Sequence, residues 1–250
     1  MTRFTALTTL ALAVALAFLT LPVIALFVHT GPAALARSLG DAAALDALRL
    51  SLETSAIALA LVVAVGTPAA YLLATRRFRG HALVTTLVEW PLVLPPAVAG
   101  VGLLAALGPN GLVDAGLVLT TAGVVAALTF VSAPYYVRAA QAAFAAVDRS
   151  LLEASRTLGA GPARTFARVA IPIARSGLAA GAALAWGRAL GEFGATLMFA
   201  GSFRGVTQTA PLAIYERFAT DFDGALALAA VLTALSLAIL LSVKALDAPR

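Results

Sequence analysis

The chain has 250 residues, of which 61% are hydrophobic and 12% are charged, and its mean hydropathy is +0.97. This composition excludes an ordinary soluble domain and indicates an integral membrane protein. The formal net charge is +5, and the absence of cysteine excludes disulfides, thiolate catalysis and metal sites built on cysteine.

Six apolar segments of about 20 residues or more follow one another along the chain, and each can cross a hydrocarbon core of roughly 30 Å as a helix. The sequence therefore predicts an all-α polytopic membrane protein with a single domain over residues 1–250. The predicted spans are 5–28, 55–74, 83–107, 117–137, 173–200 and 225–246.

The first segment also has features of a cleaved signal peptide, because Arg3 precedes it and an Ala-Leu-Ala site follows at 34–36. Its apolar core is longer than the stretch of about 7 to 15 residues that is typical of a signal peptide. We therefore expect this segment to remain as a membrane span.

The positive charges of the loops predict how the chain lies in the membrane. If the N-terminus is cytosolic, the cytosolic side holds twelve arginine and lysine residues, including Lys244 and Arg250, and the outer side holds four. Because cytosolic loops carry the excess of positive charge, we expect both termini and the polar segment 148–172 in the cytosol, with the protein in the cytoplasmic membrane. The net positive charge then reflects topology and attraction to membrane lipid, and we expect no nucleic-acid partner.

Three prolines interrupt the third predicted span, at Pro91, Pro95 and Pro96. Each removes a backbone donor, so the span is expected to kink where the freed carbonyls can meet other helices or water. A gate or hinge is one interpretation of this kink, and ordinary kinked packing is the other.

The polar segment 148–172 predicts two short helices joined by a tight turn. Ser150 and Glu153 have the spacing of a capping box, which starts a helix. Gly159 is placed to end that helix, and Pro162 suits the first position of the second one. The segment is therefore expected to form a compact helix-turn-helix on the cytosolic face.

The first of these short helices carries an apolar stripe. Leu151, Ala154 or Ser155, and Leu158 recur at helical spacing, which places them on one face. We expect this face to dock on a soluble partner, and the chain to reopen at Pro172 before the fifth span. The alternative is an amphipathic helix that lies on the membrane surface.

Two ionisable residues lie within the fifth predicted span. Arg188 and Glu192 are four residues apart, so they share a helix face and can pair. An ionisable residue near mid-membrane costs at least about 2.5 to 3.5 kcal/mol, which pairing or a wet cavity must offset. We therefore expect the two residues to mark a translocation pathway. A purely structural ion pair is the alternative.

The sequence offers no catalytic or metal-binding constellation. His29 and His81 are predicted on opposite sides of the membrane, so they cannot share a metal. The only lysine, Lys244, has no Gly-Lys-Ser/Thr context, so we expect any ATP hydrolysis to occur in another chain. An intramembrane enzyme would need paired carboxylates or a Ser/His pair, and a secondary transporter would need a coupling-ion site, which the few intramembrane charges do not supply.

The run EASRTLGAGPARTFARVAIP at 153–172 resembles the EAA loop of binding-protein-dependent ABC importer permeases. The family pattern is EAA, three residues, Gly, nine residues and Ile-x-Leu-Pro; this chain departs at Ser155, Val169 and Ile171. In that family the loop is the coupling helix, which inserts into a cleft on the ATPase subunit. The resemblance implies this role for Glu153, Ala154, Ser155 and Gly159, and the apolar stripe adds Leu158.

Two further stretches resemble the oxyanion branch of the family, namely PLVLPPAVAG at 91–100 and GRALGEFGAT at 187–196, the latter followed by TAPLAIY at 209–215. They are similar to permeases of molybdate or tungstate importers, with the sulfate and thiosulfate permeases close behind. The pathway or gate is then expected to involve Arg188, Glu192, Gly194 and Thr196.

The resemblance also implies the assembly around the chain. It implies a type I permease that forms a homodimer, or pairs with a paralogous permease, and that carries two ABC ATPase subunits. It further implies an extracytoplasmic oxyanion-binding protein that delivers the substrate. ATP and Mg²⁺ would be bound by the ATPase, so this chain is expected to bind no cofactor or metal of its own.

Overall fold

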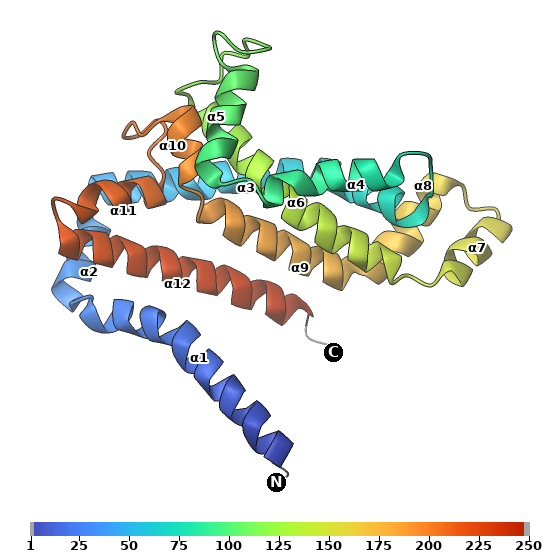
Figure 1. Cartoon of the computed structure of the whole chain (residues 1–250), viewed down its shortest axis with the longest axis horizontal. Coiled ribbons are helices and arrows are strands. Elements are labelled where there is room, and N and C mark those ends of the chain that lie inside the picture. Colours follow the sequence, from blue (N-terminus) through green and yellow to red (C-terminus); the bar gives the residue numbers. More distant parts are fainter. Residues whose placement is uncertain (1–2, 248–250) are drawn as a thin grey trace.

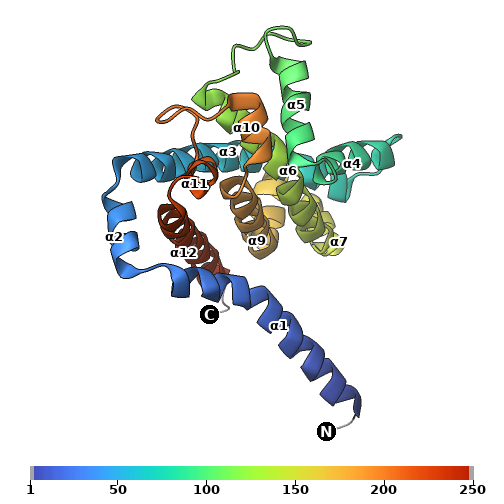
Figure 2. The same ribbon diagram turned by 60° about the vertical axis from the view of Figure 1, so that its left-hand side comes forward.

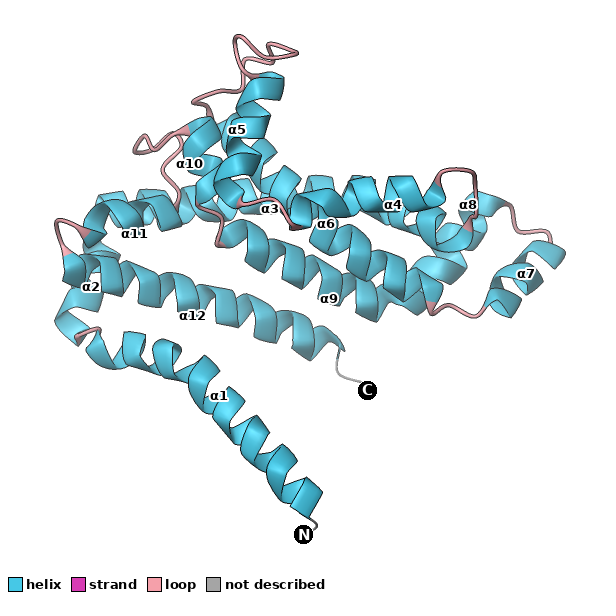
Figure 3. Ribbon diagram, in the orientation of Figure 1, coloured by secondary structure: helices cyan, strands magenta, loops and turns pink. Residues whose placement is uncertain are grey.

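The computed structural model describes residues 3–247, with side chains up to residue 242, and every regular element in this part of the chain is a helix (Figure 1, Figure 3). Arg250 and the side chain of Lys244, which enter the orientation argument, lie outside what is described. The all-α prediction is confirmed.

The helices follow one another along the chain in this order: α1 (Arg3–His29), α2 (Pro32–Gly40), α3 (Ala42–Thr75), α4 (His81–Glu89), η1 (Trp90–Leu92), α5 (Pro96–Leu107), α6 (Thr121–Ala145), α7 (Arg149–Thr157), α8 (Pro162–Thr165), η2 (Phe166–Ala170), α9 (Ile171–Leu190), α10 (Gly194–Ala200), α11 (Ala210–Phe218) and α12 (Phe222–Asp247).

Five helical segments of the described residues are long and apolar enough to cross a membrane: α1, α3, α6, the continuous helix 162–190 and α12. Helix α4 with η1, taken together with α5, forms a sixth candidate whose two parts are bent by 114°. The predicted spans 5–28, 55–74 and 225–246 lie inside α1, α3 and α12, although α3 begins much earlier, at Ala42.

The fourth predicted span, 117–137, is displaced in the structure. Helix α6 begins at Thr121 and continues to Ala145. The side chain of Thr120 accepts a hydrogen bond from the N–H of Gly123 at 3.1 Å, so Thr120 is the N-cap and the residues before it stay outside the helix.

The kink predicted for the span 83–107 is present, and it is a complete break of the helix. Helix α4 ends at Glu89, the 3₁₀ turn η1 follows, and α5 starts afresh at Pro96. Proline lacks an amide N–H and its ring crowds the preceding turn, but it suits the first position of a helix. The prolines of this segment therefore end one helix and start the next, in a new direction.

The prediction of one continuous span over 173–200 is wrong. Helix α9 ends at Leu190, and α10 begins at Gly194 after a break of three residues. At the break the Oε1 atom of Glu192 accepts the N–H of Ala195 at 2.7 Å. The carboxylate thus satisfies one of the donors that a new helix start leaves unpaired.

The predicted opening of the chain at Pro172 does not occur. The helix is continuous over 162–190 and passes through the π turn η2, in which the N–H of Ile171 donates to the carbonyl of Phe166. A proline inside an α-helix removes a hydrogen bond and crowds the carbonyl four residues earlier. The wider π turn immediately before Pro172 provides the room that the ring needs.

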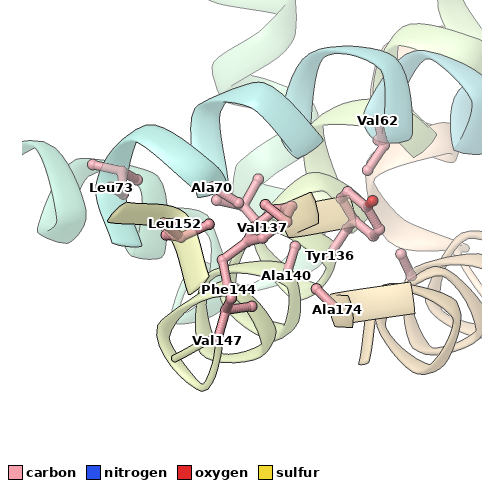
Figure 4. Close-up of a cluster of buried hydrophobic side chains, with 12 residues drawn as sticks. Val62, Ala70, Leu73, Tyr136, Val137, Ala140, Phe144, Val147, Leu152 and Ala174 are labelled. Carbon is pink, nitrogen blue, oxygen red and sulfur yellow. The ribbon is translucent and has the colours of Figure 1, made fainter. Parts of the chain in front are cut away.

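Helices α3, α6 and α9 pack against one another as the central bundle (Figure 2). A Cβ atom on Gly66 of α3 would lie 2.9 Å from the ring of Tyr136 on α6, so the two helices approach closely there. The Tyr136 hydroxyl shares a 2.7 Å hydrogen bond with the hydroxyl of Thr67. Nearer to α7, the bundle contains the buried apolar cluster of Figure 4, in which Phe144 and Leu152 belong to the same core.

Two glycines of α9 provide a matched test of the packing between α6 and α9. A Cβ on Gly177 would lie 2.5 Å from the Cβ of Ala143, whereas a Cβ on Gly187 would meet nothing within 4 Å. We expect Gly177→Ala to destabilise the chain by about 1 to 3 kcal/mol through overpacking. Gly187→Ala should leave stability unchanged or raise it by about 0.5 to 1 kcal/mol, because alanine favours a helix. Thermal unfolding of the detergent-purified variants measures both effects, and equal shifts for the two variants would contradict the packing.

Candidate functional site

Helix α7 begins the polar segment that links α6 to α9. Its N-cap is Asp148, whose carboxylate accepts the N–H of Ser150 at 2.8 Å, and hydrogen bonding to Ser150 holds the pKa of Asp148 below its usual value. The predicted capping box at Ser150 and Glu153 is therefore wrong. With Asp148 as N-cap, the buried Val147 and Leu152 take the two positions of a hydrophobic staple, which fixes this start of the helix.

Helix α7 has one anchored face and one free face. Leu152 is buried in the core cluster of Figure 4, and the hydroxyls of Ser155 and Thr165 lie 3.0 Å apart. On the other side Leu151 is 47% exposed and Leu158 is 88% exposed. The predicted stripe is thus divided, because Ser155 faces α8 while the two exposed leucines face outward. An anchored helix with exposed leucines offers a surface to another chain.

The turn after α7 requires a glycine. Gly159 has a φ of +84°, the left-handed region in which residues with a Cβ are strained. A Cβ there would meet nothing within 4 Å, so the requirement comes from the backbone and not from crowding. The predicted helix end at Gly159 is confirmed. Glu153, Ala154 and Leu158 are exposed beside this turn, and Ser155 lies beneath them.

The predicted pairing of Arg188 and Glu192 is present, at the break between α9 and α10. The Nη2 atom of Arg188 lies 2.6 Å from Oε2 of Glu192, and the two side chains are 24% and 1% exposed. Oε2 of Glu192 has no hydrogen-bond partner of good geometry among the described residues, so its contact with Arg188 is mainly an attraction between opposite charges. Because Oε1 binds the N–H of Ala195, one buried carboxylate both caps α10 and compensates Arg188.

The bent membrane segment, through its second part α5, packs directly against α10, the short helix that follows the span 162–190. A Cβ on Gly194 of α10 would lie 2.9 Å from the Cβ of Pro96, and one on Gly100 of α5 would lie 2.7 Å from the carbonyl oxygen of Ala195. Both approaches are possible only because these positions carry no side chain. The contribution of Pro96 and Gly100 to the site was missed by sequence reasoning, although both lie in the proline-rich stretch 91–100.

The four predicted pathway residues lie together around this break. Arg188 and Gly194 are partly exposed, whereas Glu192 and Thr196 are buried. The hydroxyl of Thr196 finds no hydrogen-bond partner within the described part of the chain. The residues on α7 lie elsewhere in the molecule, at the opposite end of the helix that begins at Pro162 (Figure 1).

Metal binding finds no support in the described residues. Among the described side chains, which end at residue 242, no three histidine or acidic groups gather closely enough to hold an ion. What these residues provide is a charge-compensated pair at the end of α9 and, at the other end of the same long helix, a short helix with two exposed leucines.

Within the described residues, several helices long and apolar enough to cross a membrane pack into one bundle, and a short polar segment is anchored to it, which is the architecture of a polytopic membrane protein. The chain belongs to the family described as binding-protein-dependent transport system inner membrane component, which matches residues 66–249.

Individual relatives cover most of the chain. The molybdenum transport system permease protein ModB of Mycobacterium tuberculosis is 43% identical over 206 residues, which cover 80% of this chain and 78% of ModB. A probable molybdenum ABC transporter permease protein of Haloferax volcanii is 39% identical over 244 residues, which cover 96% of this chain and 89% of the relative. Among solved structures, a bacterial alginate ABC transporter in complex with an alginate pentasaccharide-bound periplasmic protein aligns with a TM-score of 0.76 and 17% identity. The alignment covers 98% of this chain and 93% of the transporter chain, which shows a shared fold.

The Arg188–Glu192 pair predicts a non-additive double-mutant cycle. Glu192→Ala leaves the Arg188 charge uncompensated and removes the acceptor of the Ala195 N–H, so we expect a loss of about 3 to 5 kcal/mol in unfolding free energy. Arg188→Ala/Glu192→Ala removes both charges and should lose less than Glu192→Ala alone. The measurement is thermal unfolding of the purified chains; a double variant that loses the sum of both single effects would show that the pair does not interact.

Proposed function

We propose that this chain is the membrane-spanning subunit of an ATP-driven importer that moves molybdate or tungstate across the cytoplasmic membrane. The observation that carries the proposal is the similarity, over 80% and 96% of the chain, to permeases named for molybdenum transport. The sulfate and thiosulfate permeases, which the sequence also resembles, are the alternative cargo class. A secondary anion transporter or channel is the more distant alternative.

Helix α7 supports coupling to a separate ATPase. Its buried side ties it to the core through Leu152, and its free side presents Leu158, so a push on the helix would be carried into the membrane domain. ATP and Mg²⁺ would bind in the ATPase, and this chain would act as the receiver of the movement. The coupling residues in this proposal are Glu153, Ala154, Ser155, Leu158 and Gly159.

The charged pair supports an anion pathway. An unpaired arginine in a low-dielectric site would attract a doubly charged oxyanion strongly enough to hold it. The contact between Arg188 and Glu192 lowers that attraction, so an anion could be drawn in and still leave. Gly194 and Thr196 would set the position of this pair, because both belong to the start of α10.

The other partners in this proposal, a second copy of the chain and a substrate-binding protein, are inferred from the exposed surface of α1 and from similar proteins. Helix α1 has no buried residue and contacts mainly α12, so its apolar surface is free for lipid or for a second copy of this chain (Figure 1). In our proposal two copies form a homodimer, with both termini in the cytosol and one ATPase on each α7. An extracytoplasmic oxyanion-binding protein delivers the substrate, and the alginate transporter in complex with its alginate-bound periplasmic protein supports this arrangement.

Uptake by proteoliposomes tests this function. The vesicles contain this chain, its cognate ATPase and its binding protein, and are offered molybdate, tungstate or sulfate in separate experiments. We expect uptake and ATP hydrolysis that are stimulated by molybdate or tungstate. Stimulation by sulfate alone would move the assignment to the alternative cargo, and uptake without ATP would contradict an ABC importer.

Two neighbouring glycines isolate the contribution of the coupling turn. Gly159 and Gly161 both have open space where a Cβ would lie, but φ is +84° at Gly159 and −66° at Gly161. We expect Gly159→Val to reduce substrate-stimulated ATP hydrolysis by about tenfold or more, since a β-branched residue is strained by roughly 1 to 2 kcal/mol in this region and would reshape the turn. Gly161→Val should retain near-normal hydrolysis. Equal activity of the two variants would show that the turn geometry plays no part in coupling.

A further inference from the structure

A basic cavity lies between α7 and the ends of α3 and α6. Its volume is about 260 Å³, and its polar wall contains Arg77, which follows α3, and Arg149, Glu153 and Arg156 of α7. None of these three arginines forms an ion pair among the described residues, although five such pairs occur elsewhere in that part of the chain. The cavity is therefore lined by positive charge that the chain itself leaves uncompensated.

The charges of the wall favour an anion. Three arginines face one carboxylate, that of Glu153. The carbonyl ends of α3 and α6 add roughly half a negative charge each, because the helix dipole leaves partial negative charge at a helix C-terminus. The N-terminal end of α7, at Arg149, adds roughly half a positive charge by the same argument, so the lining stays net positive and favours an anion.

Apart from Thr75, the remaining wall of the cavity is apolar. Phe144, Val147 and Leu152 line it and belong to the buried core cluster of Figure 4. These side chains are only 2%, 5% and 6% exposed, so they form a narrow apolar wall, which the glycerol of a lipid headgroup would cover and a small inorganic anion would not. The cavity is also too small for a protein segment of any length, which argues against a peptide as its occupant.

The position of the cavity agrees with a lipid headgroup. It lies where two candidate membrane spans, α3 and α6, come to an end, next to the basic run that begins at Arg76. Basic pockets at the cytosolic ends of membrane helices attract anionic lipid headgroups. We propose that the phosphate group of an anionic inner-leaflet lipid binds in this cavity, between Arg77, Arg149 and Arg156, and bridges the end of α3 to the docking helix α7.

The test compares lipid binding by matched variants of the full chain. Arg149→Gln/Arg156→Gln removes two charges from the cavity, and Arg164→Gln/Arg168→Gln removes two exposed charges of the same loop that do not line it. Native mass spectrometry of the detergent-purified chain measures binding of dioctanoyl phosphatidylglycerol, with dioctanoyl phosphatidylcholine as the zwitterionic control. Equilibrium dialysis with radiolabelled inorganic phosphate measures whether a free anion uses the same site.

We expect phosphatidylglycerol to bind more tightly than phosphatidylcholine, and the cavity variant to bind it about tenfold more weakly or worse, while the loop variant stays near wild type. Phosphate binding with the same sensitivity to the cavity variant, without preferential binding of phosphatidylglycerol, would assign the occupant to a soluble anion and overturn the lipid proposal. Unchanged lipid and phosphate binding in the cavity variant would overturn the proposal. An equal loss in both variants would also overturn it, because it would show only general surface attraction. Comparable thermal unfolding temperatures of the two variants establish that both are folded.

Discussion

The bent membrane segment meets α10 where α5 packs against it, and the backbone groups released at a helix break must be satisfied inside the protein wherever water is absent. At the break between α9 and α10 the carboxylate of Glu192 binds the N–H of Ala195 and contacts Arg188. The close approach at Gly194 and Gly100 holds α5 and α10 together. The charge of Glu192 would be costly if it were buried alone, but here it stabilises the helix break between α9 and α10.

The helix that begins at Pro162 connects the Arg188–Glu192 pair to α7, the docking surface that we propose. It runs without a break over 162–190, which corresponds to about 43 Å at the usual rise per residue. One end follows the turn at Gly159, and the other end carries Arg188. A movement imposed on α7 would therefore reach the charged pair through one rigid element, which is the physical basis of the coupling that we propose. The same continuity explains why a π turn, and not a helix end, accommodates Pro172.

The sequence predicted what depends on composition and on local spacing. The helical class, the membrane character, the helix end at Gly159 and the pairing of Arg188 with Glu192 all follow from patterns within a few residues. The prolines at 91, 95 and 96 predict the bend in the third span, whereas the interruption at 191–193 has no proline, and hydropathy, which measures apolar length, is insensitive to a change of direction. The N-cap was placed at Ser150 because its spacing to Glu153 fits a capping box; burial of Val147 and Leu152, a tertiary effect, selects Asp148 instead. In the contact between α5 and α10, Gly194 meets Pro96 and Gly100 meets Ala195, residues far apart in the chain, which no local pattern reveals.

The proposed pathway requires that the break at Arg188 borders an aqueous path. The chain has no cysteine, so Gly187→Cys places a single thiol beside the charged pair at a position with open space around it. In the complete transporter a charged, membrane-impermeant thiol reagent should label this residue, at rates that differ between the nucleotide-free and ATP-bound states. Ala140→Cys, at a fully buried position of the central bundle, should stay unlabelled in both. If Gly187→Cys is equally unreactive in both states, Arg188 and Glu192 are a structural pair and the pathway lies elsewhere.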